Sequence, residues 1–258
     1  MSGAARHRAG PGRWAASLAE LADLALARTC AGCGVPGTRW CSGCALGLTG
    51  PLLSRELGAG LRVWSAAAYD GAVRTALVAW KDHDRPDVTP ALAVALQRAA
   101  RTAVGGLLDP PRLVVVPAPS SSAARRARGR SPVRDLAHRI ARGLRRRGTP
   151  AMMLPVLRQR RGVHDQAALD ADARAANLAG ALWVPDPWLP HLHGRACLLV
   201  DDVLTTGATL SEAMRALRAA GAGPVVGVTV AATVLRRPNA APSDNLVAGL
   251  SAVGLNFD

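Results

Sequence analysis

The sequence predicts an α/β fold in which a parallel sheet is flanked by helices and preceded by a small four-cysteine module. Runs rich in valine and leucine at 113–116, 197–203 and 225–234 contain few polar residues, as expected for strands that are buried on both faces. Stretches with apolar residues at helical spacing separate these runs, and this alternation favours a parallel sheet. Two Cys-x-x-Cys pairs, at 30–33 and 41–44, come before all of these elements.

The N-terminal part of the chain is predicted to hold the cysteine module and its connections. Residues 1–12 are expected to be disordered, whereas residues 14–27 repeat apolar side chains at helical spacing. Residues 47–60 are rich in Gly, Pro and Leu, which predicts a connector. The predicted division of the chain is a disordered N-terminus (1–12), a helix with the four-cysteine module and connector (13–60), the α/β domain (61–235) and an irregular tail (236–258).

The first half of the α/β domain is predicted to begin with a strand at 62–69, where apolar and polar residues alternate. Helices follow at 70–80 and 89–103, separated by the polar turn 81–88. The next strand, at 113–116, is stopped by two prolines, which cannot continue the pairing of a central strand.

The second half of the domain repeats the pattern of strand, turn and helix. Ser131 and Pro132 predict a helix start, with the hydroxyl at the N-cap and proline in the first helical position, and one apolar stripe follows as far as Gly148. The remaining predicted elements are a strand at 152–157, a helix at 170–178, a strand at 197–203, a helix at 209–220 and a strand at 225–234.

The chain is strongly basic, and its net charge of +14 favours anionic partners such as nucleotides or nucleic acid. Thirteen arginines and a single acidic residue, Asp135, lie between Arg125 and Arg161. No apolar run approaches the roughly 20 residues that a membrane-spanning helix needs. The basic N-terminus is followed by no secretory apolar core, so we expect a cytoplasmic protein.

The four cysteines Cys30, Cys33, Cys41 and Cys44 form two knuckles that can close a tetrahedral site of four sulfur atoms. The spacing does not choose between zinc and iron. A reducing compartment favours a structural zinc ion, and two disulfides are the alternative. Cys197 lies in an apolar run, where a small buried side chain is the simpler interpretation than a nucleophile.

Two adjacent carboxylates, Asp201 and Asp202, follow the apolar run 198–200. Ligands of open parallel sheets bind at the carboxyl ends of the strands, which is where these acids are expected to lie. Neighbouring carboxylates repel each other and therefore need a partner. The vicinal hydroxyls of a ribose, or a hydrated Mg²⁺, would serve.

The turn that follows is composed of Thr205, Thr206, Gly207, Ala208 and Thr209, and it leads directly into a helix. N–H groups at a helix N-terminus form an anion site with the helix dipole, and the threonines add hydroxyl donors. The glycine allows a positive φ or a close approach of the backbone. Acids and turn together predict a site for a phosphorylated ribose. The alternatives are an ordinary turn in which the aspartates cap the helix, and a response-regulator acid pocket, which has no such turn.

The segment 200–210, VDDVLTTGATL, resembles the 5-phosphoribosyl-1-pyrophosphate (PRPP) motif of the type I phosphoribosyltransferases. Within that superfamily, nearly the whole chain resembles the ComF family, whose bacterial members include competence proteins for DNA uptake. The paired cysteines carry this likeness, as does the strand end 115–119 with Arg128 and Gly129 after it. A spaced run also carries it, and its residues are Arg158, Gln166, Leu169, Arg174 and Asn177.

The resemblance implies the type I phosphoribosyltransferase fold and a mechanism. The acidic pair would hold the ribose hydroxyls, and the threonine-rich turn would hold the 5-phosphate through its N–H groups. Ser120, Ser121 and Arg125 would face the pyrophosphate, and Mg²⁺ would bridge pyrophosphate and ribose. A nitrogen nucleophile would then displace the pyrophosphate, with catalysis by positioning and electrostatics. The family usually has an aromatic residue and an Asn-Gln pair after Arg-Gly, whereas this chain has the segment 130–132, Arg-Ser-Pro.

Lys81 is the only lysine among 32 lysines and arginines. The family has a lysine in a comparable place after a helix, which implies a role in substrate binding, and a solvated surface charge is the alternative. His83 with Asp82 and Asp84 suggests a second metal cluster, for which a polar turn is the alternative.

Two functions from different classes remain open. The first is an enzyme that transfers phosphoribosyl to a nitrogenous acceptor. The second is a non-catalytic accessory that binds PRPP or a nucleotide and handles incoming single-stranded DNA beside a helicase-like competence protein. The arginine face of the helix at 134–147 would track the DNA backbone, although such a face is more commonly only solvated.

Overall fold

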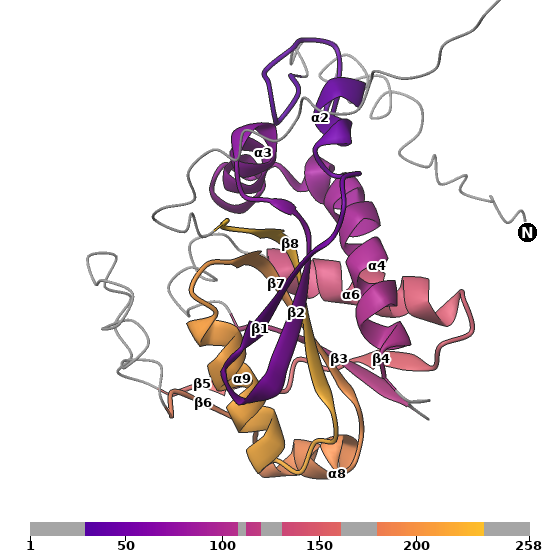
Figure 1. Ribbon diagram of the computed structural model, residues 1–258, viewed down its shortest axis with the longest axis vertical. Helices are drawn as coiled ribbons and strands as arrows, with labels where there is room; N and C mark the ends of the chain where they lie inside the picture. Colours follow the sequence, from indigo (N-terminus) through magenta and orange to yellow (C-terminus); the bar gives the residue numbers. More distant parts are fainter. Residues whose placement is uncertain (1–28, 108–111, 120–130, 161–179, 235–258) are drawn as a thin grey trace, which may run out of the picture.

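The computed structural model has a central sheet of six strands in the order β1-β2-β8-β7-β3-β4 (Figure 1). Five strands run parallel, and β1 pairs antiparallel with β2 at one edge. The structure describes residues 29–107, 112–119, 131–160 and 180–234. The strands of the sheet are β1 (Leu53–Leu57), β2 (Leu61–Ala68), β3 (Leu113–Pro117), β4 (Ala151–Met153), β7 (Cys197–Leu204) and β8 (Val225–Ala232).

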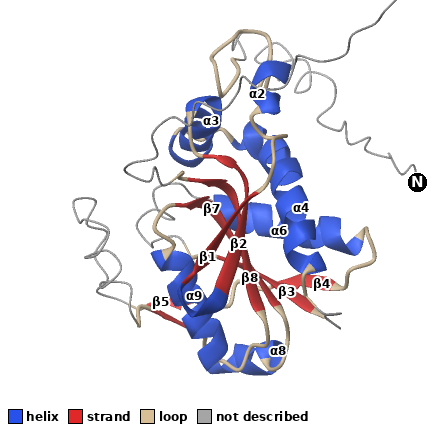
Figure 2. Cartoon of the chain, in the orientation of Figure 1, coloured by secondary structure: helices blue, strands red, loops and turns tan. Residues whose placement is uncertain are grey.

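Helices cover both faces of this sheet, as Figure 2 shows. The larger helices are α3 (Gly71–Asp82), α4 (Thr89–Gly105), α6 (Pro132–Arg145) and α9 (Ala208–Ala219). The short ones are α2 (Ser42–Leu46), α8 (Leu189–Leu192) and the 3₁₀ turns η1 (Gly58–Gly60), η2 (Pro86–Val88) and η3 (Asp186–Trp188). A separate two-stranded sheet pairs β5 (Arg158–Gln159) with β6 (Leu182–Trp183).

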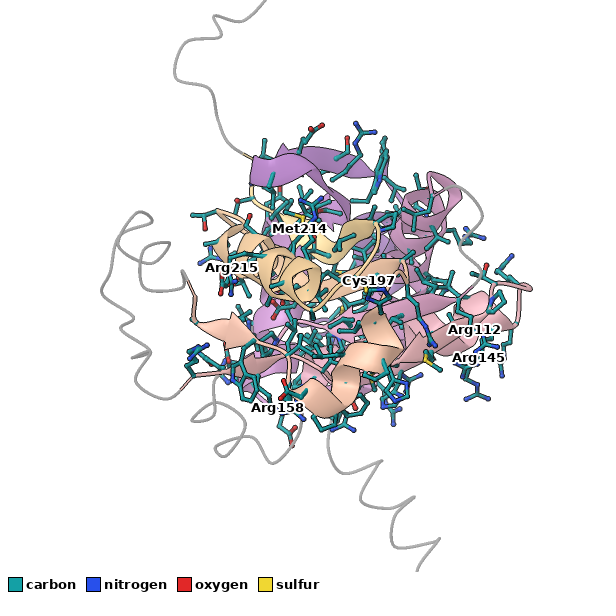
Figure 3. All side chains as sticks on the ribbon, turned by 90° about the horizontal axis from the view of Figure 1, so that it is seen from below. Arg112, Arg145, Arg158, Cys197, Met214 and Arg215 are labelled. Carbon is teal, nitrogen blue, oxygen red and sulfur yellow. The ribbon has the colours of Figure 1, made fainter. Side chains whose placement is uncertain are left out.

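The core has two halves because the central strands bury side chains on both faces. Leu198 and Val200 of β7 pack in the half that contains α3, α4 and α6, whereas Cys197 and Leu199 pack in the half that contains α8 and α9. Strand side chains alternate between faces, so a strand buried on both sides must be apolar along its length. Figure 3 shows Cys197 and Met214 inside the molecule, and both are at least 98% buried.

The structure confirms most of the predicted elements, including the parallel sheet covered by helices. The predicted connector at 47–60 is wrong where β1 forms, because Leu53, Arg55 and Leu57 turn toward the sheet while the residues between them are exposed. The predicted strand at 152–157 is shorter, since β4 ends at Met153, two residues before a proline that has no N–H to donate.

The start of α6 differs from the prediction, and some predicted elements fall outside the described residues. Ser131 is the N-cap residue of α6, but its hydroxyl makes no capping hydrogen bond, so proline and the apolar stripe define the helix start. The helices predicted at 14–27 and 170–178 lie outside the described residues, as do the N-terminus and the tail at 236–258. Within the described ranges, no helix is both long enough and apolar enough to cross a membrane.

Candidate functional site

The carboxyl end of β7 carries the two predicted acids, and their carboxylates are held by the backbone that follows each of them. Asp201 Oδ1 accepts the N–H of Asp202 at 2.8 Å, and Asp202 Oδ1 accepts the N–H of Val203 at 2.9 Å. Asp202 is only 5% exposed, whereas Asp201 is partly exposed. The two side chains therefore lie at the predicted sheet edge, in unequal surroundings.

Lys81, in the last turn of α3, forms an ion pair with the buried acid. Its Nζ lies 2.6 Å from Asp202 Oδ2, with the lysine side chain 41% exposed and the aspartate side chain 6% exposed. The lysine is thus partly solvated, as the surface-charge alternative expects, and it also has a buried partner. Its substrate-binding role stays a prediction.

Asp201 carries the strongest electrostatic perturbation of the site. Burial, followed by the negative charge of Asp202, raises the pKa of Asp201 to about 8. Backbone hydrogen bonding and the charge of Lys81 oppose this shift. Two adjacent carboxylates at one strand end are costly to ionise together, which favours the protonated form of Asp201. Such a pair can both accept and donate hydrogen bonds.

The turn from β7 into α9 holds the glycine and the threonines for which an anion site was predicted. Gly207, the N-cap residue of α9, has a φ of 87°, in the left-handed region that favours glycine. Thr205 and Thr206 are exposed, and Thr209 is half-buried. The Ala208 N–H contacts the Thr206 hydroxyl at 3.3 Å. The turn thus brings the predicted threonines together at the N-terminus of a 12-residue helix.

Strand β1 lies against this turn, which the sequence patterns did not predict. Arg55 donates to the carbonyl of Thr205 at 2.7 Å and also to the carbonyl of Thr233. Leu57 covers Gly207, which is buried. The only sequence signal for these two residues is an alternation of large side chains over 53–57 that an arginine interrupts.

Two cavities open near the carboxyl ends of the strands. One, of about 290 Å³, is lined by Pro117 and Pro119 of the β3 end and by Arg134 and Arg158. The other, of about 220 Å³, is lined mostly by apolar groups and also by Arg55. Pro119 and Ser131 both line the first cavity, and Ser120, Ser121 and Arg125 lie outside the described residues.

The four cysteines of the N-terminal module come together as the metal-site prediction requires. Their Sγ atoms all lie within 4.8 Å of one another, and Cys33 Sγ is 3.7 Å from Cys41 Sγ. Zinc–sulfur bonds of about 2.3 Å place the sulfurs of a tetrahedral site about 3.8 Å apart. All five cysteines of the chain are free thiols, so the disulfide alternative is wrong.

The backbone around the sulfurs is shaped to fit a metal. The N–H groups of Cys41 and Cys44 each approach a cysteine sulfur at 3.4 Å. Burial disfavours the thiolate of Cys30, but such backbone hydrogen bonds outweigh it and lower its pKa to about 6. A Cβ at Gly32 would lie 2.7 Å from Cys44 Sγ, so only glycine leaves room for that sulfur. Zinc fits this cluster. Among the described residues the four cysteines form the one such group, and no second cluster forms at 82–84.

Comparison with known proteins agrees with the character of this strand end. Residues 136–249 match the family model of the phosphoribosyl transferase domain. No curated protein matches the chain. Solved structures of low sequence identity also match this chain.

Three structures illustrate these matches. Adenine phosphoribosyl transferase from Trypanosoma brucei has 11% identity and a TM-score of 0.37, with 72% of this chain and 92% of that chain covered. HGPRT-ase from Leishmania tarentolae has 18% identity and a TM-score of 0.30, with 57% and 66% covered. Glutamine PRPP amidotransferase from B. subtilis has 19% identity and a TM-score of 0.31, with 54% and 26% covered. The chain thus spans about a quarter of the amidotransferase.

Proposed function

We propose that this chain, with its phosphoribosyl transferase domain match over residues 136–249, binds PRPP and transfers its phosphoribosyl group to a nitrogenous acceptor, releasing pyrophosphate. The proposed catalytic unit is 61–235, to which β1 adds an edge strand. The observation that carries the proposal is the junction of β7 and α9. It joins two carboxylates to a positive-φ glycine turn at a helix N-terminus, inside the matched domain.

The proposed roles follow from the chemistry of each group at this junction. Asp201 and Asp202 bind the ribose hydroxyls, since a carboxylate accepts from a diol and a protonated carboxyl group can also donate to it. The backbone N–H groups at the start of α9, with the hydroxyls of Thr205, Thr206 and Thr209, bind the 5-phosphate. Binding of the 5-phosphate exchanges the weak contact between the Ala208 N–H and Thr206 for a charge-assisted hydrogen bond.

The pyrophosphate is proposed to lie beyond the end of β3, toward Ser120, Ser121 and Arg125. The cavity lined by Arg134 and Arg158 adjoins this position and adds positive charge beside it. Mg²⁺ accompanies PRPP and supplies charge neutralisation to the leaving group. The protein residues fix the orientation of the sugar, so that the acceptor nitrogen meets the anomeric carbon opposite the leaving pyrophosphate.

Within the superfamily, the ComF family is the proposed relative, and the N-terminal module supports this. The four-cysteine cluster precedes the domain, and β3 ends in a Pro-x-Pro segment. Cys30, Cys33, Cys41 and Cys44 would hold a structural zinc ion. Ala31, between Cys30 and Cys33, and Leu48, after Cys44, pack into the core half that contains α3 and α4. Zinc would therefore fix this module against the catalytic unit, in a protein that we propose to be cytoplasmic.

The function is tested by isothermal titration with PRPP and Mg²⁺, followed by a screen for pyrophosphate release across purine and pyrimidine bases. We expect micromolar binding and release with at least one base. The double variant Asp201→Asn and Asp202→Asn should lose release. Arg101→Ala, an exposed change on α4, should retain it. No binding of PRPP by the parent protein would refute the proposal.

A second function is supported by the exposed arginines of α6. Arg134, Arg139, Arg142, Arg146 and Arg147 are all exposed at or beside this helix, whose opposite face is buried. A basic face of this kind fits a phosphate backbone, and we propose an accessory role with single-stranded DNA, beside a helicase-like partner, as the alternative. In this case PRPP would bind without pyrophosphate release for any acceptor.

A gel shift with single-stranded DNA separates this alternative from non-specific attraction. The variant with Arg142, Arg146 and Arg147 changed to alanine leaves Arg145 in place, which donates to the carbonyl of Ala151. A control triple variant at Arg62, Arg74 and Arg101 removes the same charge from exposed positions elsewhere. Equal losses of affinity in both variants would remove the DNA interface from α6.

A further inference from the structure

The ion pair between Lys81 and Asp202 joins two elements that are far apart in the sequence. The lysine comes from the end of α3, and the acid comes from the end of β7. The lysine ammonium group reaches in from a partly exposed position to a carboxylate that is almost completely buried. A buried carboxylate is costly without a compensating cation. The pair therefore stabilises a charge that the fold places at the proposed ribose site.

The helix end that carries Lys81 is anchored. The neighbouring residue, Trp80, is fully buried, and its Nε1 donates to the hydroxyl of Thr89 at 2.9 Å. This indole packs in the same core half as α4. Its position fixes the last turn of α3 over the sheet, so the ammonium group is delivered to one place at the strand end.

The ion pair leaves part of the Asp202 carboxylate available. Oδ2 contacts the lysine, and Oδ1 accepts the N–H of Val203 at 2.9 Å. A carboxylate has about four lone-pair sites, so each oxygen can accept one more hydrogen bond. The side chain of Asp201 also hydrogen-bonds to Asp202, whose side chain is only 6% exposed, so one acceptor site is left for a single sugar hydroxyl.

An arginine at this position would leave less room for a diol. A guanidinium group binds a carboxylate with two parallel N–H donors and so occupies both oxygens, whereas an ammonium group acts as a point charge. Lys81 is the only lysine of the chain, and the other residues counted with it as lysine or arginine are all arginines. The single exception stands where a one-point contact matters.

We propose that Lys81 is a positioning residue for ribose recognition, which holds Asp202 charged and oriented while one acceptor site of its carboxylate receives a sugar hydroxyl. This inference rests on the proposed function, because it needs the diol of a phosphoribosyl ligand at this acid. The lysine acts through Asp202. Asp202 contacts the sugar hydroxyl, and we expect loss of the lysine to leave binding of the 5-phosphate unchanged.

The test compares ribose 5-phosphate with 2-deoxyribose 5-phosphate, by titration of the full chain. We expect the parent protein to prefer ribose 5-phosphate by at least about tenfold, the effect of a hydrogen bond to a charged group. Lys81→Met should reduce this preference to about twofold, with little change in affinity for the deoxy sugar. Arg74→Met removes an exposed charge from the same helix and should leave the preference unchanged.

The outcomes separate the inference from the function it rests on. Failure of the parent protein to bind PRPP or ribose 5-phosphate refutes the proposed function and the inference with it. Normal binding by the parent with an undiminished ribose preference in Lys81→Met overturns the inference alone. An equal loss for both sugars indicates a merely structural lysine, and also overturns it. If Lys81→Met does not fold, Lys81→Arg decides, since it keeps the charge and should still lose the preference.

Discussion

The side chain of Leu57 lies against Gly207 so closely that a Cβ added to the glycine would be 2.5 Å from Leu57 Cδ1. The edge strand β1 is therefore packed on the turn that we propose to bind the 5-phosphate. Two separate constraints meet at this glycine, since its φ of 87° is also disfavoured for any side chain. The contact with Leu57 couples the geometry of the turn to the position of β1.

The first prediction is that Gly207→Ala destabilises the fold by roughly 2–4 kcal/mol, from backbone strain and overpacking together. Urea unfolding measures this change. Leu57→Ala in the same chain should recover the overpacking part and leave the backbone strain. A Gly207→Ala variant as stable as the parent would contradict the described packing.

The second prediction concerns pH and Asp201, whose pKa is raised by burial and by Asp202 from its usual 3.8 to about 8. The folded protein holds this proton more tightly than the unfolded chain does. The resulting stabilisation is complete below about pH 4 and is lost as the pH rises through about 8. Melting temperatures between pH 5 and 9 should fall more steeply for the parent than for Asp201→Asn. Parallel curves for the two proteins would sink this assignment.

The third prediction concerns the metal. Purified protein should contain one zinc ion per chain, and Cys33→Ser should abolish binding while Cys197→Ser retains it. Cys197 is buried in the core away from the four-cysteine cluster, so that thiol is no ligand. Removal of zinc by a chelator should lower the melting temperature by about 4–8 °C, if the module contributes about 2 kcal/mol. Metal analysis and differential scanning calorimetry give both values, and a metal-free protein of unchanged stability would count against the site.

Local patterns in the sequence were sufficient for the elements in which burial is uniform. Strand β7 and helix α9 could be predicted because a doubly buried strand is apolar throughout and a surface helix repeats every three to four residues. The acids and the threonine turn could be located for the same reason, since they occupy the junction between these two patterns. The cysteine cluster could be predicted from the spacing of its two Cys-x-x-Cys pairs alone.

Contacts between distant segments could not be predicted in this way. Strand β1 was missed because Arg55 occupies an inward position, where its guanidinium group binds carbonyls at the ends of β7 and β8. That position is polar in the sequence and half-buried in the fold. The pairing of Lys81 with Asp202 could not be predicted either, since composition and the family resemblance distinguished the lysine but gave it no partner. Only the sheet order brings α3 over the end of β7.

The last prediction concerns Glu212, a buried acid on α9 that holds β6 in place. Its Oε1 accepts the N–H of Leu182 at 3.0 Å, and Arg215 donates to both of its carboxylate oxygens at 2.7 and 2.8 Å. Glu212→Leu leaves the buried N–H without this acceptor, and we expect a loss of about 2–4 kcal/mol in urea unfolding. The exposed acid Glu56, paired with Arg62 at 3.5 Å, is the matched control, because exposed ion pairs contribute little. Equal stabilities of Glu212→Leu and Glu56→Leu would show that the hydrogen bonds of Glu212 do not hold β6 against α9.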